Sequence, residues 1–253
     1  MAVRTYKARG LVLRKAKLRE SDAIITILDS DGERRDAVAH GARRPGSSLS
    51  GRMELYSEVD LVCAKGRNLD TITDSRLTPG SLHRFGMEQS LCAAPVAELL
   101  VSVSQVGLRQ SRLYELARAT FSAIADSKEQ SAPAFAAAAL LKICAIAGVR
   151  PTFDTCVLCG RPIEQSAATV PFSTEDGGAI CSACPRPSDA VIHDAVNLAW
   201  AHQLLYSRYD AISEINVPTK VSFAVLSIAG AWAHGHFGTR LKSLDVLMSC
   251  GLF

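Results

Sequence analysis

The fold of the first part of the chain follows from residues 23–41, which read AIITILDSDGERRDAVAHG. An isoleucine-rich run over 23–28 is joined to a second run over 33–41 by Asp31-Gly32, a dipeptide typical of tight β-hairpin turns. β-Branched and apolar residues on both sides of such a turn favour paired strands. The stretch therefore predicts two antiparallel strands.

Three further strand-like runs flank this hairpin, at residues 6–17, 55–64 and 69–77. Apolar and polar residues alternate in the run 55–64, and the side chains expected to point inward are Leu55, Val59, Leu61 and Cys63. Together with the hairpin these runs make five short strands in about 75 residues. Such spacing predicts a small closed β-barrel over residues 1–80.

Two breaks interrupt the strand pattern. Residues 43–51, RRPGSSLSG, have the composition of a mobile loop, and Thr78-Pro79-Gly80 ends the pattern. After Gly80, apolar residues recur at helical spacing. Helices are expected over 96–103, 108–124, 133–147, 194–209, 219–237 and 241–250, with Pro95 and Pro133 in first turns.

The remaining stretch, residues 150–190, is rich in proline and carries four of the eight cysteines, so it is expected to be loop-like. The Ala-rich run over 132–149 contains Lys142 and fits a buried helix better than a membrane span, which needs about 20 strongly apolar residues. The resulting fold class is α+β. The expected domains are a barrel at 1–80 and a helical domain at 81–253, with a cysteine-bearing insertion at about 150–190.

The cysteines in this insertion form the sharpest motif of the chain. Cys156 and Cys159 are separated by two residues, as are Cys181 and Cys184. Two such turns offer four thiolates to one tetrahedral zinc ion, and Gly160 suits the tight turn after the first pair. Four cysteines leave no open coordination position, so the predicted zinc is structural rather than catalytic. Unrelated redox motifs or free thiols are the alternative.

The other four cysteines lie in apolar runs and are expected to pack in the core: Cys63, Cys92, Cys144 and Cys250. Signatures of catalysis are missing from the sequence. There is no Walker-type or dinucleotide-binding fingerprint, and no His-x-Glu motif of a zinc deaminase. We also find no arrangement for nucleophilic catalysis, so the sequence predicts a protein that is not an enzyme.

Positive charge is concentrated at the start of the chain. The net charge is +3 overall, yet residues 1–80 carry 15 Lys and Arg against 11 Asp and Glu. Residues 1–19 contain seven basic residues and no acidic one. This asymmetry suggests a polyanionic partner, although a solvated basic face would look the same.

No targeting segment or membrane span is apparent in the sequence, so a cytoplasmic location is expected, where thiols stay reduced. A basic five-stranded barrel is a common nucleic-acid-binding fold. Because residues 1–80 contain only two aromatic residues, Tyr6 and Tyr56, phosphate contacts rather than base stacking should dominate binding.

The order of these features resembles the bacterial RecO family of recombination mediators. The resemblance rests on YKARGLVLR at 6–14, on Glu20-Ser21-Asp22 before IITIL at 24–28, and on HGARRP at 40–45. Further along, CVLCG at 156–160 is similar to the zinc-bearing form of the family, and Leu241-Lys242-Ser243 is similar to its final helix.

This resemblance implies an N-terminal OB-fold barrel, a helical domain and a zinc module. It also implies binding to single- and double-stranded DNA, strand annealing, and cooperation with RecR. The family engages the tail of single-stranded DNA-binding protein (SSB), so that RecA can be loaded, in the cytoplasm at the nucleoid. The expected DNA-binding residues are Lys7, Arg9, Arg14, Lys15, Lys17, Arg19, Arg34, Arg35, Arg43, Arg44 and Arg67. A zinc-containing RNA-binding or transcription-associated adaptor is the alternative function.

Overall fold

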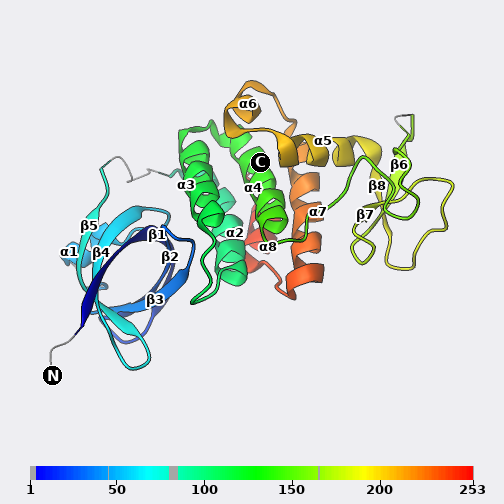
Figure 1. Ribbon diagram of the computed structural model, residues 1–253. Coiled ribbons are helices and arrows are strands. Elements are labelled where there is room, and N and C mark those ends of the chain that lie inside the picture. The colour runs from blue at the N-terminus through cyan, green and yellow to red at the C-terminus, as the bar shows by residue number, and fades with distance from the viewer. Residues whose placement is uncertain (1–3, 45, 80–84, 165, 253) are drawn as a thin grey trace. The chain divides into compact units, whose positions relative to one another are not determined.

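The computed structural model describes residues 4–44, 46–79, 85–164 and 166–252 (Figure 1). The chain divides into two compact units. The first comprises residues 1–85 and 100–125, and the second comprises residues 86–99 and 126–253. The end of the first predicted domain, Gly80, lies outside the described residues.

The first unit contains the predicted five-stranded closed barrel. Its strands are β1 (Thr5–Lys17), β2 (Ala23–Asp29), β3 (Arg34–Ala39), β4 (Glu58–Ala64) and β5 (Asp70–Leu77). They are ordered β1-β2-β3-β5-β4, and β1 closes the barrel by pairing with both β2 and β4. The long β1 serves two neighbours because it bends at a bulge between Val12 and Arg14. The fold class predicted from the sequence is confirmed.

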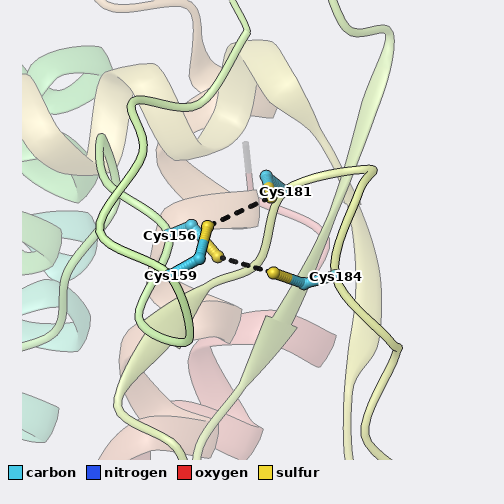
Figure 2. Close-up of side chains that lie close together, drawn as sticks. All are labelled: Cys156, Cys159, Cys181 and Cys184. Atoms are coloured by element: carbon cyan, nitrogen blue, oxygen red, sulfur yellow. Dashed lines mark hydrogen bonds between the residues drawn. The ribbon is translucent and has the colours of Figure 1, made fainter.

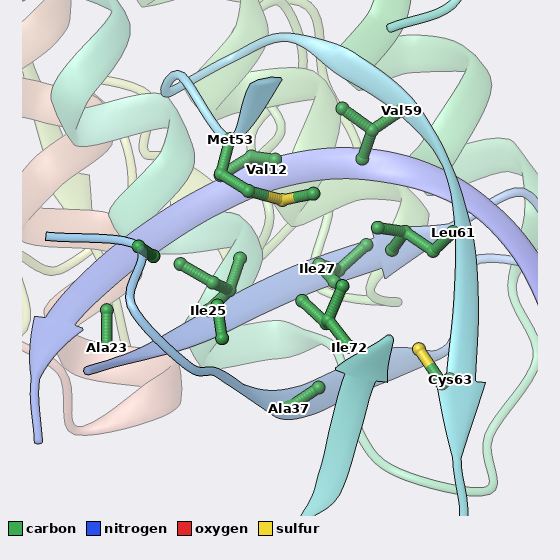
Figure 3. Close-up of a cluster of buried hydrophobic side chains, with 12 residues drawn as sticks. Val12, Ala23, Ile25, Ile27, Ala37, Met53, Val59, Leu61, Cys63 and Ile72 are labelled. Atoms are coloured by element: carbon green, nitrogen blue, oxygen red, sulfur yellow. The ribbon is translucent and has the colours of Figure 1, made fainter. Parts of the chain in front are cut away.

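Alternating side chains from all five strands fill the barrel (Figure 3). Val59, Leu61 and Cys63 point inward as predicted, but Leu55 precedes β4 and is 38% exposed, so its predicted inward position is wrong. Met53 is fully buried among the same core residues. Gly10 lets β1 approach β2, because a Cβ there would lie 2.5 Å from the carbonyl oxygen of Leu28.

The segment expected to be a mobile loop, 43–51, is partly ordered. Residues Ser48–Arg52 form one helical turn, α1, and Arg52 donates a hydrogen bond to the Ser75 carbonyl at 2.9 Å. Leu49 packs against the barrel core, and this apolar contact stabilises the segment. The polar, glycine-containing composition of the segment does not indicate such a contact.

Helices α2 (Met87–Val103) and α3 (Ser111–Asp126) follow the barrel. Pro95 lies inside α2 rather than in its first turn, because the helix begins eight residues earlier. There the Gly86 N–H donates to Oε1 of Gln89 at 2.7 Å, a contact that stabilises a helix start. Within the first unit, the Phe121 ring of α3 packs on Tyr56 with their ring centroids 4.9 Å apart.

The second unit is built around α4 (Ala132–Ile146), where Pro133 occupies the first turn as predicted. The other helices are α5 (Ala195–Tyr206), α6 (Tyr209–Glu214), α7 (Thr219–Phe237) and α8 (Lys242–Ser249). Twelve residues of α4 are buried, which confirms the predicted buried helix. Among the described residues, we find no helix with the length and apolar character needed to cross a membrane.

The stretch 150–190 was expected to be loop-like, and this is wrong in part. It contains the strands β6 (Thr169–Ser173) and β7 (Gly178–Ala179), which form an antiparallel sheet with β8 (Val191–Asp194), just after the stretch, in the order β7-β6-β8. Phe172 of β6 anchors this sheet, since its ring lies 5.3 Å from that of Phe153 and 5.4 Å from that of Trp232. Aromatic packing thus compensates for the high proline content of the segment.

Candidate metal centre and nucleic-acid interface

The four cysteines of the insertion converge on one point (Figure 2). Their sulfur atoms all lie within 4.8 Å of one another. The Sγ atoms of Cys159 and Cys181 are 3.6 Å apart, and those of Cys156 and Cys184 are 3.9 Å apart. Four sulfurs at 2.3 Å from one tetrahedral ion would be separated by about 3.8 Å, so the cluster has the dimensions of a four-thiolate metal site.

These separations exclude disulfides, whose sulfur atoms are about 2.05 Å apart. All eight cysteines are free thiols in the structure. The turn at the first pair is held by a hydrogen bond from the Gly160 N–H to the Cys156 carbonyl at 2.9 Å. Gly160 has a φ of 74°, which confirms the predicted need for glycine at this turn.

Arg161 is a further component of the cluster. Its Nε donates to Sγ of Cys159 at 3.4 Å, and its guanidinium also reaches Sγ of Cys181 at 3.8 Å. This hydrogen bond lowers the pKa of Cys159 to about 6, because it stabilises the thiolate. Four thiolates around a divalent cation carry excess negative charge, and the guanidinium offsets part of it.

Of the remaining cysteines, three behave as core residues. Cys63, Cys92 and Cys144 are at most 2% exposed, as predicted. Burial raises the pKa of both Cys92 and Cys144 to about 12, so these thiols stay protonated and unreactive at neutral pH. Cys250 is partly exposed, and its predicted core position is therefore wrong.

Two separate segments that carry basic side chains adjoin at one end of the barrel. We call this set the basic rim, and it consists of Lys17, Arg19, Arg43 and Arg44. All four are exposed, and within the described ranges none has a carboxylate at ion-pair distance. The segments are joined directly, because Nη1 of Arg43 donates to the carbonyl oxygens of Arg19 and Glu20 at 3.3 and 3.1 Å.

Asp22 fastens the two segments of the rim together. One carboxylate oxygen accepts a hydrogen bond from the Gly41 N–H at 2.9 Å, and the other lies 3.0 Å from Nδ1 of His40. The bond from Gly41, followed by that from His40, lowers the pKa of the Asp22 carboxyl, so it remains ionised at neutral pH. The turn after β1 and the loop after β3 are thereby held side by side.

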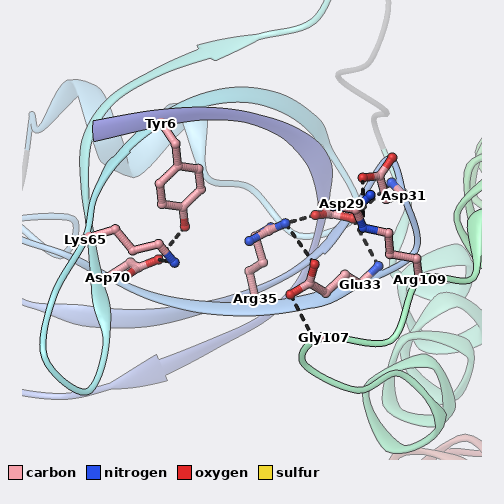
Figure 4. A network of polar contacts seen from close by, with 9 residues as sticks. All are labelled: Tyr6, Asp29, Asp31, Glu33, Arg35, Lys65, Asp70, Gly107 and Arg109. Atoms are coloured by element: carbon pink, nitrogen blue, oxygen red, sulfur yellow. Dashed lines mark hydrogen bonds and ion pairs between the residues drawn. The ribbon is translucent and has the colours of Figure 1, made fainter. Parts of the chain in front are cut away.

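Arg34 and Arg35 both contact groups within the first unit, and Figure 4 shows the contacts of Arg35. Arg35 lies 2.6 Å from the Asp29 carboxylate and 3.0 Å from that of Glu33, both of which are buried. Arg34 donates to the Val101 carbonyl at 3.1 Å and lies 3.5 Å from Asp36. Their charges are therefore balanced by protein groups.

The other basic residues expected to bind DNA are of two kinds, those paired with a carboxylate and those without such a partner. Arg9 forms a bidentate contact with Asp60 at 2.7 and 3.1 Å, and Lys15 lies 3.6 Å from Glu54. Lys7, Arg14 and Arg67 are exposed, and no carboxylate pairs with them in the described part of the chain.

The two aromatic residues of the barrel are also engaged internally. Tyr56 is 7% exposed and packs between Phe85 and Phe121. Tyr6 donates a hydrogen bond to Asp70 at 2.5 Å, with Lys65 over its ring (Figure 4). The guanidinium of Arg35 also lies over the Tyr6 ring, 5.5 Å from its centroid, so both aromatic residues already contact protein groups.

Two family models match the chain, one for each of its two parts. Residues 1–80 match the family model for the N-terminal part of recombination protein O, and residues 84–245 match the model for its C-terminal part. The chain belongs to the RecO family. It is 32% identical to DNA repair protein RecO of Gloeothece citriformis, over 96% of each chain. It is also 33% identical to that of Gloeobacter violaceus, over 73% of this chain and 70% of the relative.

A third relative, DNA repair protein RecO of Bifidobacterium adolescentis, is 34% identical over 76% of this chain and 78% of its own length. The resemblance inferred from the sequence is thus confirmed. The names of the family model and of these relatives describe recombination and DNA repair.

Sequence reasoning missed two positioning residues of these sites, Asp22 and Arg161. In the sequence Asp22 stands out only as part of the family resemblance. Its hydrogen bonds with His40 and Gly41 depend on the tertiary fold. Arg161 had a usable signal, because a cation directly after a Cys-x-x-Cys-Gly turn is well placed to balance thiolate charge.

Proposed function

We propose that this RecO-family protein is a DNA-repair mediator that binds single- and double-stranded DNA and anneals complementary strands. Together with RecR it would help to load RecA onto DNA coated with SSB, whose C-terminal tail it would contact. Its place would be the bacterial cytoplasm, at the nucleoid. The observation that carries the proposal is the basic rim, where two adjoining segments of a closed barrel carry four exposed cations without a carboxylate partner among the described residues.

The rim is suited to phosphate rather than to bases. Its guanidinium groups can bind phosphate oxygens in a bidentate manner, whereas Tyr6 and Tyr56 already contact protein groups. Binding of this kind is largely independent of sequence and sensitive to salt. A mediator that acts on any broken DNA needs binding that does not depend on sequence.

In this proposal the primary phosphate contacts are the rim residues, with Lys7, Arg14 and Arg67 extending them. Arg9 and Lys15 would contribute less, since each already has an acidic partner. Arg34 and Arg35 would act indirectly by keeping the barrel folded.

We further propose that the four-cysteine cluster holds one structural zinc ion. The spacing of the sulfur atoms fits a tetrahedral ion, and soft thiolate ligands favour zinc. The ion would fix the two cysteine turns that flank the sheet β7-β6-β8. Metal analysis of protein purified without chelator is expected to give one zinc per chain. Four titratable thiols in the native protein and no metal would contradict the assignment.

Competition between nucleic acids tests the function. Labelled single-stranded DNA bound to the protein is challenged with unlabelled DNA or RNA of the same length and sequence. Preferential displacement by DNA is the expected result, whereas preferential displacement by RNA would favour an RNA-binding adaptor. Incubation of the labelled DNA with magnesium should leave it intact, and cleavage would show a nuclease.

A further inference from the structure

A wide groove lies in the second unit, far along the chain from the basic rim. It has a volume of about 960 Å³ and is formed by the start of α5, the strand β6 and residues 153–154, 162–164 and 167–168. Its floor is apolar and well packed, since Phe153, Val170 and Leu198 are at most 4% exposed. Val196, on the first turn of α5, is 56% exposed at its edge.

The charged residues of this groove are acidic. Asp154, Glu164 and Asp194 line it, and no lysine or arginine is among the described residues that do so. Among the described residues that line the groove, His202 is the one basic group, and its Nδ1 lies 3.8 Å from the Asp154 carboxylate. Because phosphates would be repelled by these carboxylates, the groove is unsuited to the DNA that the barrel would bind.

Exposed apolar residues also lie on β8, the strand that ends at the groove. This strand has one partner in its sheet, β6, in the described part of the chain. Val191 and Ile192 of β8 are 58% and 48% exposed, and Asp194 at the end of the strand lines the groove. An apolar edge strand beside an apolar groove is a surface on which an extended segment of another protein can dock.

We propose that this groove binds an extended segment of a partner protein in which apolar residues are flanked by lysine or arginine. The apolar side chains would cover Val196 and the groove floor. The basic side chains would face Asp154, Glu164 and Asp194. Charge complementarity selects this occupant over an acidic segment, which would bring like charges together.

The proposal can be tested with two synthetic hexapeptides, one alternating leucine with lysine and the other leucine with glutamate. Binding to the full-length, metal-loaded protein is measured by fluorescence anisotropy and mapped by amide NMR shifts. The lysine peptide should shift amides of residues 153–168 and 191–202, and the glutamate peptide should not. Absence of shifts at millimolar lysine peptide, or equal binding of both peptides, would overturn the proposal.

Matched variants separate the groove from general charge. The double variant Asp154→Asn, Glu164→Gln should bind the lysine peptide about fivefold more weakly, because two exposed ion pairs are lost. The control Glu175→Gln, Glu214→Gln removes the same charge from exposed positions outside the groove, and it should bind like the parent. Equal loss in both double variants would contradict a defined site.

The apolar part is tested by Val196→Ser, with Val246→Ser as the control. Val246 lies on α8, outside the groove, and is 54% exposed. Only the change at Val196 should weaken peptide binding. A second copy of this chain is the other possible occupant: if the parent self-associates in analytical ultracentrifugation and Val196→Ser does not, the partner-segment proposal is wrong. These measurements involve no DNA, so their outcome is independent of the proposed function.

Discussion

Replacing Arg43 and Arg44 together by alanine is expected to weaken binding to single-stranded DNA about 25-fold at roughly 0.1 M salt. Each phosphate contact with a single strand contributes about 0.7 to the slope of log K against log salt concentration. Relative to about 1 M salt, a slope of about 0.7 makes binding at roughly 0.1 M salt about five times tighter for each contact. Loss of two contacts should therefore weaken binding about 25-fold. The slope itself should become shallower by about 1.4.

The stability of this variant should change little. Both side chains are exposed, and the hydrogen bonds that Arg43 donates to Arg19 and Glu20 are at the surface. Surface changes of this kind usually alter the free energy of unfolding by less than about 0.5 kcal/mol. Thermal unfolding of the parent and the variant checks that DNA binding is lost without loss of folding.

The matched control is the neighbouring arginine pair, Arg34→Ala with Arg35→Ala. Removing Arg35 leaves Asp29 and Glu33 buried without their cation. Because Arg35 is itself 24% exposed, we expect a loss of about 2–3 kcal/mol, at the low end for a broken buried pair. The salt slope of the folded control should equal that of the parent.

The assay is fluorescence anisotropy of a labelled oligothymidine, titrated at several salt concentrations between about 50 and 200 mM. A parental slope in the Arg43, Arg44 variant would show that the rim does not contact phosphate. An equal decrease of slope in both double variants would refute the distinction between paired and free arginines.

Three further changes test other parts of the structure. Cys159→Ser should reduce bound zinc well below one equivalent and lower the melting temperature, with an unchanged DNA salt slope; full zinc content by mass spectrometry would contradict the ligand assignment. Burial lowers the pKa of Lys142 to about 8, so between pH 8 and pH 10.5 the unfolded chain binds more protons there than the folded protein does. The free energy of unfolding of the parent, relative to that of Lys142→Met, should therefore rise by about 1–2 kcal/mol over this range in urea unfolding. A difference that does not change with pH would contradict the lowered pKa. Trp232→Phe removes the hydrogen bond to the Val149 carbonyl and should cost about 1–2 kcal/mol in the same assay, whereas an unchanged stability would show that water replaces the indole.

The barrel and the metal cluster could be predicted from the sequence because both depend on local patterns. Strand alternation and the Asp31-Gly32 turn are read over a few residues, and two Cys-x-x-Cys turns define four ligands without knowledge of the fold. The strands β6 and β8 could not be predicted because they are only five and four residues long, and β6 contains Pro171. One contact that stabilises this sheet is between Phe172 and Trp232, which are sixty residues apart in the chain.

The sequence could not show which basic residues are paired with carboxylates and which are not. Arg34-Arg35 and Arg43-Arg44 look alike in the sequence, and only the packing of β2 against β3 shows that Asp29 neutralises Arg35. The rim likewise exists because Asp22 joins two loops that are about twenty residues apart. Ion pairing of this kind depends on tertiary distances that residue type and spacing do not encode.

Strand annealing by the purified protein tests the central claim most directly. Two complementary, fluorescently labelled oligonucleotides are mixed with the parent or the Arg43, Arg44 variant, without nucleotide. The parent should accelerate pairing over the rate of the strands alone, and the variant should lose that acceleration in proportion to its lost affinity. Pairing that is no faster with the parent than without it, or that requires ATP, would contradict a mediator that acts through the basic rim.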